Sequence, residues 1–308
     1  MSAQNGLVVA SYGRHFLVET PSGERVICHP RGKKSQAVVG DRVQWLPSQD
    51  EGTVEKIDER RNLFYRQDEI RTKAFAANLD QILVVIAAEP VFSEMQLARA
   101  LIAAEAAQIT PIILLNKSDL SLPFAAARER LQPYRAMGYQ VVECSIREWK
   151  AQYQNASDPL QILREQLSFL EHHTTLVLGP SGAGKSSLVN LLAADAQAQT
   201  GEISQALNSG KHTTTRTQWY WLGGEKHSAV IDSPGFQEFG LHHIEPPALA
   251  RLMPDLRAHS EHCKFYNCTH LHEPGCGVIA ALKAEKISAS RYRIYSELFA
   301  IASEPERY

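Results

Sequence analysis

The chain has 308 residues, of which 44% are hydrophobic and 21% charged, and its formal net charge is -2. This length predicts two or three domains with cores of their own, and the balanced composition excludes a disordered acidic or basic tail protein. The near-neutral total does not exclude a nucleic-acid partner, because a local basic face can be offset elsewhere.

The cysteine pattern and the lack of long apolar runs indicate the cellular compartment of the protein. We find no apolar run long enough for a membrane span, and the first residues lack the pattern of a signal peptide. Three of the five cysteines lie in residues 263–276. Such a cluster favours a metal site in a reducing compartment over a disulfide framework. We therefore expect a cytoplasmic protein.

The first 70 residues contain short apolar stretches separated by turn residues. Residues 7–20 alternate loosely, residues 21–23 supply a turn, and further strands are expected at 25–28, 38–46 and 52–57. So many short strands favour a small closed barrel of the oligonucleotide-binding type. Basic residues at 29–34 and 60–73 indicate either a solvated rim or a weak nucleic-acid surface, and the sequence leaves both open.

Residues 71–240 have a different pattern. Apolar runs typical of strands buried on both faces of a parallel sheet occur at 81–88, 111–115, 141–144 and 175–178. Helical patterns lie between them: Ser93 and Gln96 form a capping box, Asp158-Pro159 opens a helix, and another ends at Gly138. A hairpin is expected at 217–222 and 228–231. The alternation predicts a doubly wound α/β domain.

Residues 179–186 match the phosphate-binding pattern G-x-x-x-x-G-K-[ST] between a predicted strand and a predicted helix. Backbone N–H groups of such a loop surround phosphate oxygens, and the helix N-terminus adds its dipole. Lys185 is expected to reach the β- and γ-phosphates, and Ser186 to coordinate Mg²⁺. The nucleotide-binding residues that we predict here are Gly179, Pro180, Ser181, Gly182, Ala183, Gly184, Lys185, Ser186 and Ser187.

A second motif predicts the base. Asn116, Lys117, Ser118 and Asp119 follow a predicted strand, at the edge where an open α/β sheet binds ligands. A carboxylate there can accept hydrogen bonds from guanine N1–H and the 2-amino group, which adenine lacks. Ser145, at the end of the next strand, is placed to support the base. An ATP-driven P-loop enzyme would require this motif to be a coincidence.

Two further segments complete a nucleotide switch. Asp232 can hold Mg²⁺ through water, and the Gly235 N–H can meet the γ-phosphate. One threonine of residues 213–215 is expected to close on Mg²⁺, and we choose Thr214. These motifs follow the guanine motif in the chain, the reverse of the order in small GTPases, so the sequence predicts a circular permutation.

The residue after the Asp232–Gly235 motif is Phe236, where many GTPases have a glutamine that orients water. His212, beside the switch threonines, is the candidate replacement. It could equally contact RNA or pack locally, and the sequence does not separate these roles. The catalytic residues that we predict are His212, Lys185 and Thr214.

Near the C-terminus, three cysteines and one histidine have the composition of a closed tetrahedral zinc site. The ligands that we predict are Cys263, Cys268, His270 and Cys276. His262 and His272 are neighbours that could replace His270, and we rank them lower. With four protein ligands the metal would be structural. Residues 280–303 are expected to be helical.

Together these motifs resemble the ribosome small subunit-dependent GTPase A family, also called circularly permuted RsgA-type GTPases. The resemblance spans the barrel, the permuted motifs with Gly-Lys-His-Thr-Thr-Thr at 210–215, and the cysteine-rich segment. It implies a protein that binds the small (30S) ribosomal subunit and its rRNA late in assembly and hydrolyses GTP when the subunit stimulates it. It also implies that the protein helps to release another assembly factor. The sequence departs from the family at Ile146, where alanine usually follows Ser145.

We therefore expect a multidomain α/β protein with an oligonucleotide-binding-type barrel at 1–70, a circularly permuted P-loop GTPase domain at 71–240 and a mostly helical zinc-binding domain at 241–308. We expect a GTP hydrolase that uses Mg²⁺ with GTP, holds one structural Zn²⁺, and acts as a monomer without a membrane. The alternative is an RNA- or protein-binding regulatory switch whose GTP turnover is incidental.

Overall fold

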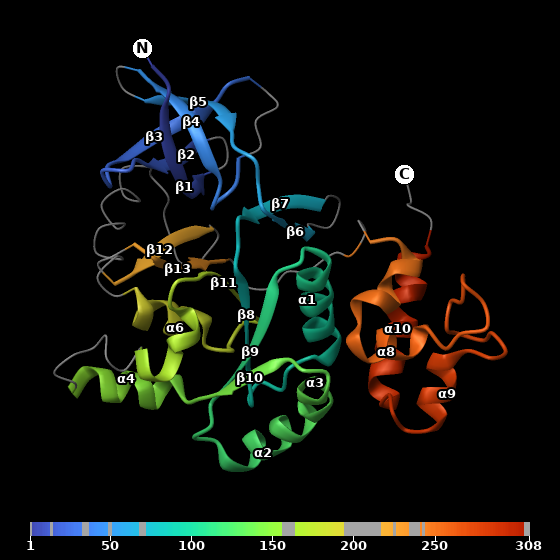
Figure 1. The fold of residues 1–308 in the computed structure, drawn as a ribbon. Helices are drawn as coiled ribbons and strands as arrows, with labels where there is room; N and C mark the ends of the chain where they lie inside the picture. The colour runs from blue at the N-terminus through green and yellow to red at the C-terminus, as the bar shows by residue number, and fades with distance from the viewer. Residues whose placement is uncertain are drawn as a thin grey trace.

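The computed structural model describes residues 2–12, 15–32, 37–48, 51–67, 72–155, 164–193, 217–223, 226–233, 241 and 244–304. A β-barrel, a central α/β layer and a group of C-terminal helices follow one another along the chain (Figure 1). Within these ranges, no helix is both long and apolar enough to cross a bilayer.

The expected N-terminal barrel is confirmed. Its strands pair in the closed order β1-β2-β3-β5-β4-β1, and the β3–β5 pair is parallel. The fully buried side chains of Val8, Val43 and Val54 fill its interior. Residues 7–20, expected as one alternating stretch, form two antiparallel strands with a register shift between Val8 and Ala10. The strands are β1 (Gln4–Tyr12), β2 (His15–Glu19), β3 (Arg25–Pro30), β4 (Arg42–Pro47) and β5 (Gly52–Ile57).

A two-stranded hairpin between the barrel and the central sheet was not expected from the sequence. Strands β6 (Leu63–Gln67) and β7 (Thr72–Ala77) pair antiparallel. The sequence indicated only a basic stretch here, because charged residues interrupt the alternation. Buried Phe64 and Ala76 belong to the same core as the central sheet, and packing against that core explains the hairpin.

The central layer is the expected doubly wound fold. Parallel strands run in the order β10-β9-β8-β11-β13, and β12 adds an antiparallel edge that also meets β1. Strand β8 is buried on both faces: Ile82, Val84 and Ile86 pack with α1, whereas Leu83 and Val85 pack with α4 and α6. The strands are β8 (Gln81–Ala87), β9 (Thr110–Asn116), β10 (Gln140–Glu143), β11 (Thr174–Leu178), β12 (Gln218–Leu222) and β13 (Ser228–Asp232).

Helices cover both faces of this sheet. Ser93 caps α1 as expected, since its Oγ accepts a hydrogen bond from the Gln96 backbone N–H at 3.3 Å. Gly138 follows the end of α3 with a positive φ of 91°. The helix start expected at Asp158-Pro159 lies outside the described residues. The helices are α1 (Glu94–Ala106), α2 (Ser121–Arg130), α3 (Gln132–Ala136), α4 (Ile146–Asn155), α6 (Lys185–Leu192) and the short η1 (Ser168–Leu170).

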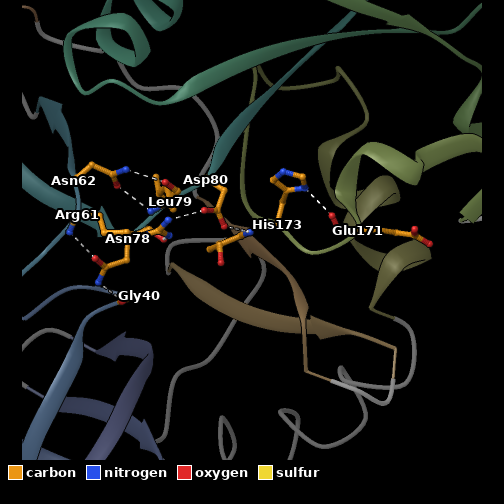
Figure 2. A network of polar contacts seen from close by, with 9 residues as sticks. Gly40, Arg61, Asn62, Asn78, Leu79, Asp80, Glu171 and His173 are labelled. Carbon is orange, nitrogen blue, oxygen red and sulfur yellow. Dashed lines mark hydrogen bonds and ion pairs between the residues drawn. The ribbon is translucent and has the colours of Figure 1, made fainter.

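Side-chain hydrogen bonds lock the connection from the barrel to the sheet (Figure 2). The Asn62 amide donates to Leu79 O at 2.8 Å and accepts from Leu79 N at 2.9 Å. The Asn78 amide donates to Gly40 O in the barrel at 2.8 Å. Asp80 accepts from Arg61 at 2.8 Å and from the Thr174 backbone N–H, at the start of β11, at 2.7 Å. The barrel is thus tied to the strand that leads into the phosphate-binding loop.

The C-terminal helices pack against α1 (Figure 1). The helix expected at 280–303 is two helices, because Glu285 has a positive φ of 57° and interrupts it. A buried ion pair joins Arg291 to Asp255 by hydrogen bonds of 2.8 and 3.1 Å, beneath the ring of Tyr134 from α3. The elements are η2 (Pro246–Leu252), α8 (Pro254–Ser260), α9 (Gly277–Lys283) and α10 (Ala289–Ala302).

Candidate functional site

The predicted motifs meet at the carboxyl edge of the parallel sheet. Strands β9, β11 and β13 end at Asn116, Leu178 and Asp232, so the residues that directly follow them lie at the same edge of the sheet. They surround a cavity of about 640 Å³. Its lining comprises Asn116, Lys117, Asp119, Ile146, Arg147, Lys150, Ser181, Gly182, Gly184, Lys185, Ser186, Ser187 and Ser233.

Two glycines of the phosphate-binding loop sit where a side chain cannot fit. Gly179 has φ 150°, and a Cβ there would lie 2.0 Å from Val85 O of the neighbouring strand. Gly184 has φ 105°, and its Cβ would lie 2.4 Å from the Asn116 side-chain nitrogen. Gly184 directly precedes α6, whose first turn faces the cavity. The loop can therefore present backbone N–H groups and a helix N-terminus to an anion.

The buried side chain of Asn116 holds three segments together. Its Nδ2 donates to Ala183 O in the phosphate-binding loop at 2.8 Å. Its Oδ1 accepts from the backbone N–H groups of Lys117 at 2.8 Å and Ile146 at 3.0 Å. Asn116 therefore connects the ends of β9 and β10 to the loop after β11, a connection that residue spacing does not reveal.

Asp119 and Ser145 are also in contact. Ser145 Oγ donates to Asp119 Oδ1 at 2.8 Å and accepts from the Glu148 backbone N–H at 3.2 Å. Ser118 N donates to Cys144 O at 2.9 Å. The carboxylate of Asp119 is thus oriented within the cavity lining, and it keeps a second oxygen for another donor.

At the other end of the site, the charges of Lys185 and Asp232 act on each other. Burial lowers the pKa of Lys185, and the charge of Asp232 partly opposes this. Burial raises the pKa of Asp232 to about 6, against the opposing effects of the Ser233 N–H and Lys185. Lys185 Nζ donates to Pro180 O at 3.0 Å. The ammonium group of Lys185 can thus interact with an anion, and the carboxylate of Asp232 with a cation.

Four residues of the cavity lining were not predicted as site residues: Ile146, Arg147, Lys150 and Ser233. Arg147 Nη1 lies 3.9 Å from Asp119 Oδ2. Helix α4 begins immediately after Ser145, so residues of its first turns project toward the cavity. The position of Ser145 one residue before a helix was the signal that could have indicated them.

Part of the predicted site lies outside the described residues. This applies to His212, Thr213, Thr214, Thr215, Gly235 and Phe236. The predictions made on these residues stay predictions.

The predicted metal ligands form one cluster in the segment between α8 and α9. His270 Nδ1 lies 3.4 Å from Cys263 Sγ and 3.5 Å from Cys276 Sγ, and the two sulfurs are 3.9 Å apart. The ligand atoms of these three and Cys268 all lie within 4.8 Å of one another. Neither His262 nor His272 belongs to the group. The four residues could hold a metal ion.

Hydrogen bonds between side chains and the backbone shape this cluster. His270 has φ 59°, and Tyr292 Oη donates to its carbonyl at 2.8 Å. Glu273 accepts from Thr269 N and from Leu271 N at 2.7 and 3.2 Å. Burial acts to raise the pKa of Glu273, but hydrogen bonds from the Thr269 hydroxyl and from the backbone N–H groups of Thr269, Glu273 and His272 lower it to about 2. The carboxylate thus stays charged and holds the ligand loop in its bent form.

Comparison with known proteins gives matches over most of the chain. The profile of the RsgA GTPase family matches residues 57–242. The small ribosomal subunit biogenesis GTPase RsgA of Variovorax paradoxus (strain S110) is 64% identical over 305 residues, which cover 97% of this chain and 93% of that protein. The protein of the same name from Burkholderia pseudomallei (strain K96243) is 51% identical over 302 residues, 97% of this chain and 92% of that protein.

Solved structures share the fold. YjeQ from Thermotoga maritima superposes with a TM-score of 0.71 at 26% identity, covering 99% of this chain and all 100% of the other. YloQ, described as a circularly permuted GTPase, has a TM-score of 0.70 at 28% identity, with 99% and 97% covered. The matches therefore cover the barrel, the α/β layer and the C-terminal helices together.

Proposed function

We propose a function that proceeds from family membership: this chain belongs to the RsgA GTPase family and is a GTP hydrolase. It acts, in our proposal, in late maturation of the small (30S) ribosomal subunit, binds the subunit through its rRNA, and hydrolyses GTP to GDP when the subunit stimulates it. The names of its close relatives support the ribosomal role.

One observation carries the choice of GTP. Residues of the phosphate-binding loop, Asn116 and Asp119 line a single cavity, and Ser145 orients Asp119 from behind by a hydrogen bond. Asp119 Oδ2, the oxygen that does not accept from Ser145 and that lies 3.9 Å from Arg147 Nη1, would accept from guanine N1–H and the 2-amino group, and adenine offers no such donors. Lys117 and Ser118 belong to the same base-binding segment.

Phosphate and Mg²⁺ would bind at the opposite end. Residues 179–187 would surround the phosphates, with Lys185 turning from Pro180 O to the β- and γ-phosphates. Ser186, Asp232 and Thr214 would hold Mg²⁺, and the Gly235 N–H would meet the γ-phosphate. The ion neutralises phosphate charge when bound. Burial disfavours the ionised form of Asp232, and a bound divalent cation would favour it.

For hydrolysis we propose His212 as the residue that positions the attacking water, since Phe236 cannot do so. Positioned acid–base groups contribute about 10²–10⁴-fold. Intrinsic turnover should therefore be slow, and contact with the subunit should bring the imidazole of His212 into line with the attacking water. His212→Ala should keep GTP affinity and subunit binding but lose most of the stimulated turnover. Normal turnover of this variant on saturating subunits would exclude the role.

The metal in the C-terminal cluster is, we propose, one structural Zn²⁺ per chain. A tetrahedral ion with Zn–S of about 2.3 Å and Zn–N of about 2.0–2.1 Å requires ligand separations of roughly 3.5–3.8 Å. The separations around His270, between 3.4 and 3.9 Å, fit this. Cys268→Ala should release the metal and loosen these helices, because metal binding is folding energy here. Nucleotide binding should persist.

We place the domain boundaries at residues 70 and 240. We also propose that the protein acts in the cytoplasm as a monomer and that other assembly factors are further partners. The experiment that tests the function measures GTP turnover with and without purified small subunits, together with co-sedimentation in GTP-analogue and GDP states. Turnover that subunits do not change would favour a regulatory switch with incidental hydrolysis.

A further inference from the structure

Two histidines and a glutamate meet on the outer face of the barrel, far along the chain from the cysteine cluster. The antiparallel pair Phe16↔Cys28 joins β2 to β3, and the parallel pair Cys28↔Gly52 joins β3 to β5. All three of these residues are buried in the barrel. Because side chains alternate along a strand, the adjacent His15, His29 and Glu51 point outward. Strands β2 and β3 and the residue directly before β5 thus contribute one ligand-type side chain each to one spot.

This register brings the side chains of His15, His29 and Glu51 together. The ring centroids of His15 and His29 are 4.5 Å apart, and the rings are tilted by 58°. His29 Nε2 pairs with a carboxylate oxygen of Glu51. One ligand atom from each of the three residues lies within 4.8 Å of the other two. The side chains of His29 and Glu51 are 42% and 38% exposed, so an ion from solvent can reach them.

This donor set has a specific chemistry. Neutral imidazoles with one carboxylate suit borderline divalent metals, whereas Mg²⁺ and Ca²⁺ prefer oxygen ligands alone. Three protein ligands leave a coordination position open, which distinguishes exchangeable sites from closed structural ones. We propose that His15, His29 and Glu51 form a second metal site, on the barrel, that binds a divalent transition-metal ion with Zn²⁺ as the first choice.

The barrel does not depend on these three side chains to fold, so the metal site can be tested by substituting them. The barrel is closed by its own strand pairing and has a core of fully buried side chains, including Val8, Val43 and Val54. The three ligands lie outside that core. Substituting them should therefore leave the barrel folded, with unchanged thermal unfolding in the absence of added metal.

The experiment uses the full chain with Zn²⁺ already bound at the cysteine cluster. Further Zn²⁺ is titrated into it in buffer without chelator, and binding is measured by calorimetry. One further equivalent should bind. His29→Ala and Glu51→Gln should each weaken it at least about tenfold, the loss that even indirect support of a metal ligand costs. The matched controls His227→Ala and Glu24→Gln, which remove an exposed imidazole and an exposed carboxylate elsewhere, should bind it as the wild type does.

Co²⁺ gives a second readout. The added equivalent should produce visible bands without thiolate charge transfer, because the three ligands include no sulfur. Absence of a second equivalent, equal binding in the ligand variants and the controls, or thiolate bands from the second ion would each overturn the proposal.

Discussion

The hydrogen bonds of Asn116 lead to a prediction about how nucleotide affinity is built. Asn116→Asp keeps both backbone N–H donors, from Lys117 and Ile146, but replaces the group that donates to Ala183 O at 2.8 Å. Two oxygens would then face each other, and the phosphate-binding loop would lose its connection to β9. A buried polar group left without its partner costs about 1–3 kcal/mol. The empty site would therefore no longer be preorganised.

If the whole cost falls on nucleotide binding, the GDP and GTP dissociation constants should rise about 5–150-fold, since 1.4 kcal/mol is about tenfold. Equilibrium titration with a fluorescent guanine nucleotide measures this directly. Asn116→Ala, which removes all three bonds without adding charge, should weaken binding at least as much. Gln152→Glu, on an exposed position of α4 outside the cavity lining, controls for the added charge.

Two results would refute this reasoning. Wild-type affinity in Asn116→Asp would show that the link to Ala183 does not hold the loop in its binding form. A weak Asp variant beside an unaffected Ala variant would show that the added charge, and not the lost hydrogen bond, causes the effect.

Three further outcomes are expected. Asp119→Asn should lower GTP affinity and raise affinity for xanthosine nucleotides in the same titration, because an amide can donate where the carboxylate accepted; unchanged GTP affinity would contradict the assignment. The pKa of Asp232 is raised to about 6, so the native state binds more protons than the unfolded state, and stability falls as pH rises from about 4 to 6. In urea titrations without nucleotide and Mg²⁺, Asp232→Asn should therefore stabilise the protein above pH 6 by on the order of 1–3 kcal/mol, and this gain should vanish near pH 4; a gain that ignores pH would refute it. Asp255→Ala leaves buried Arg291 without its carboxylate and should lower the free energy of unfolding by about 3–5 kcal/mol; thermal unfolding like that of the wild type would count against a structural role.

The sequence alone predicted the parts of this protein whose chemistry lies in contiguous residues. A phosphate-binding loop needs its glycines and lysine at set spacing, so residues 179–186 could be recognised directly, as could residues 116–119 and the cysteine cluster. Strand β8 was recognisable because burial on both faces leaves an unbroken apolar run. The barrel followed from the spacing of its turns.

Only the tertiary structure decided which of these segments touch and what else lines the site. The bond between Asn116 and Ala183 joins residues 67 positions apart, and Arg147 reaches the cavity because α4 starts at its edge. The hairpin β6–β7 forms because Phe64 and Ala76 pack into a core made by other strands. His15, His29 and Glu51 meet only through the register of three strands. Such contacts depend on packing and register between distant segments, which local side-chain patterns do not encode.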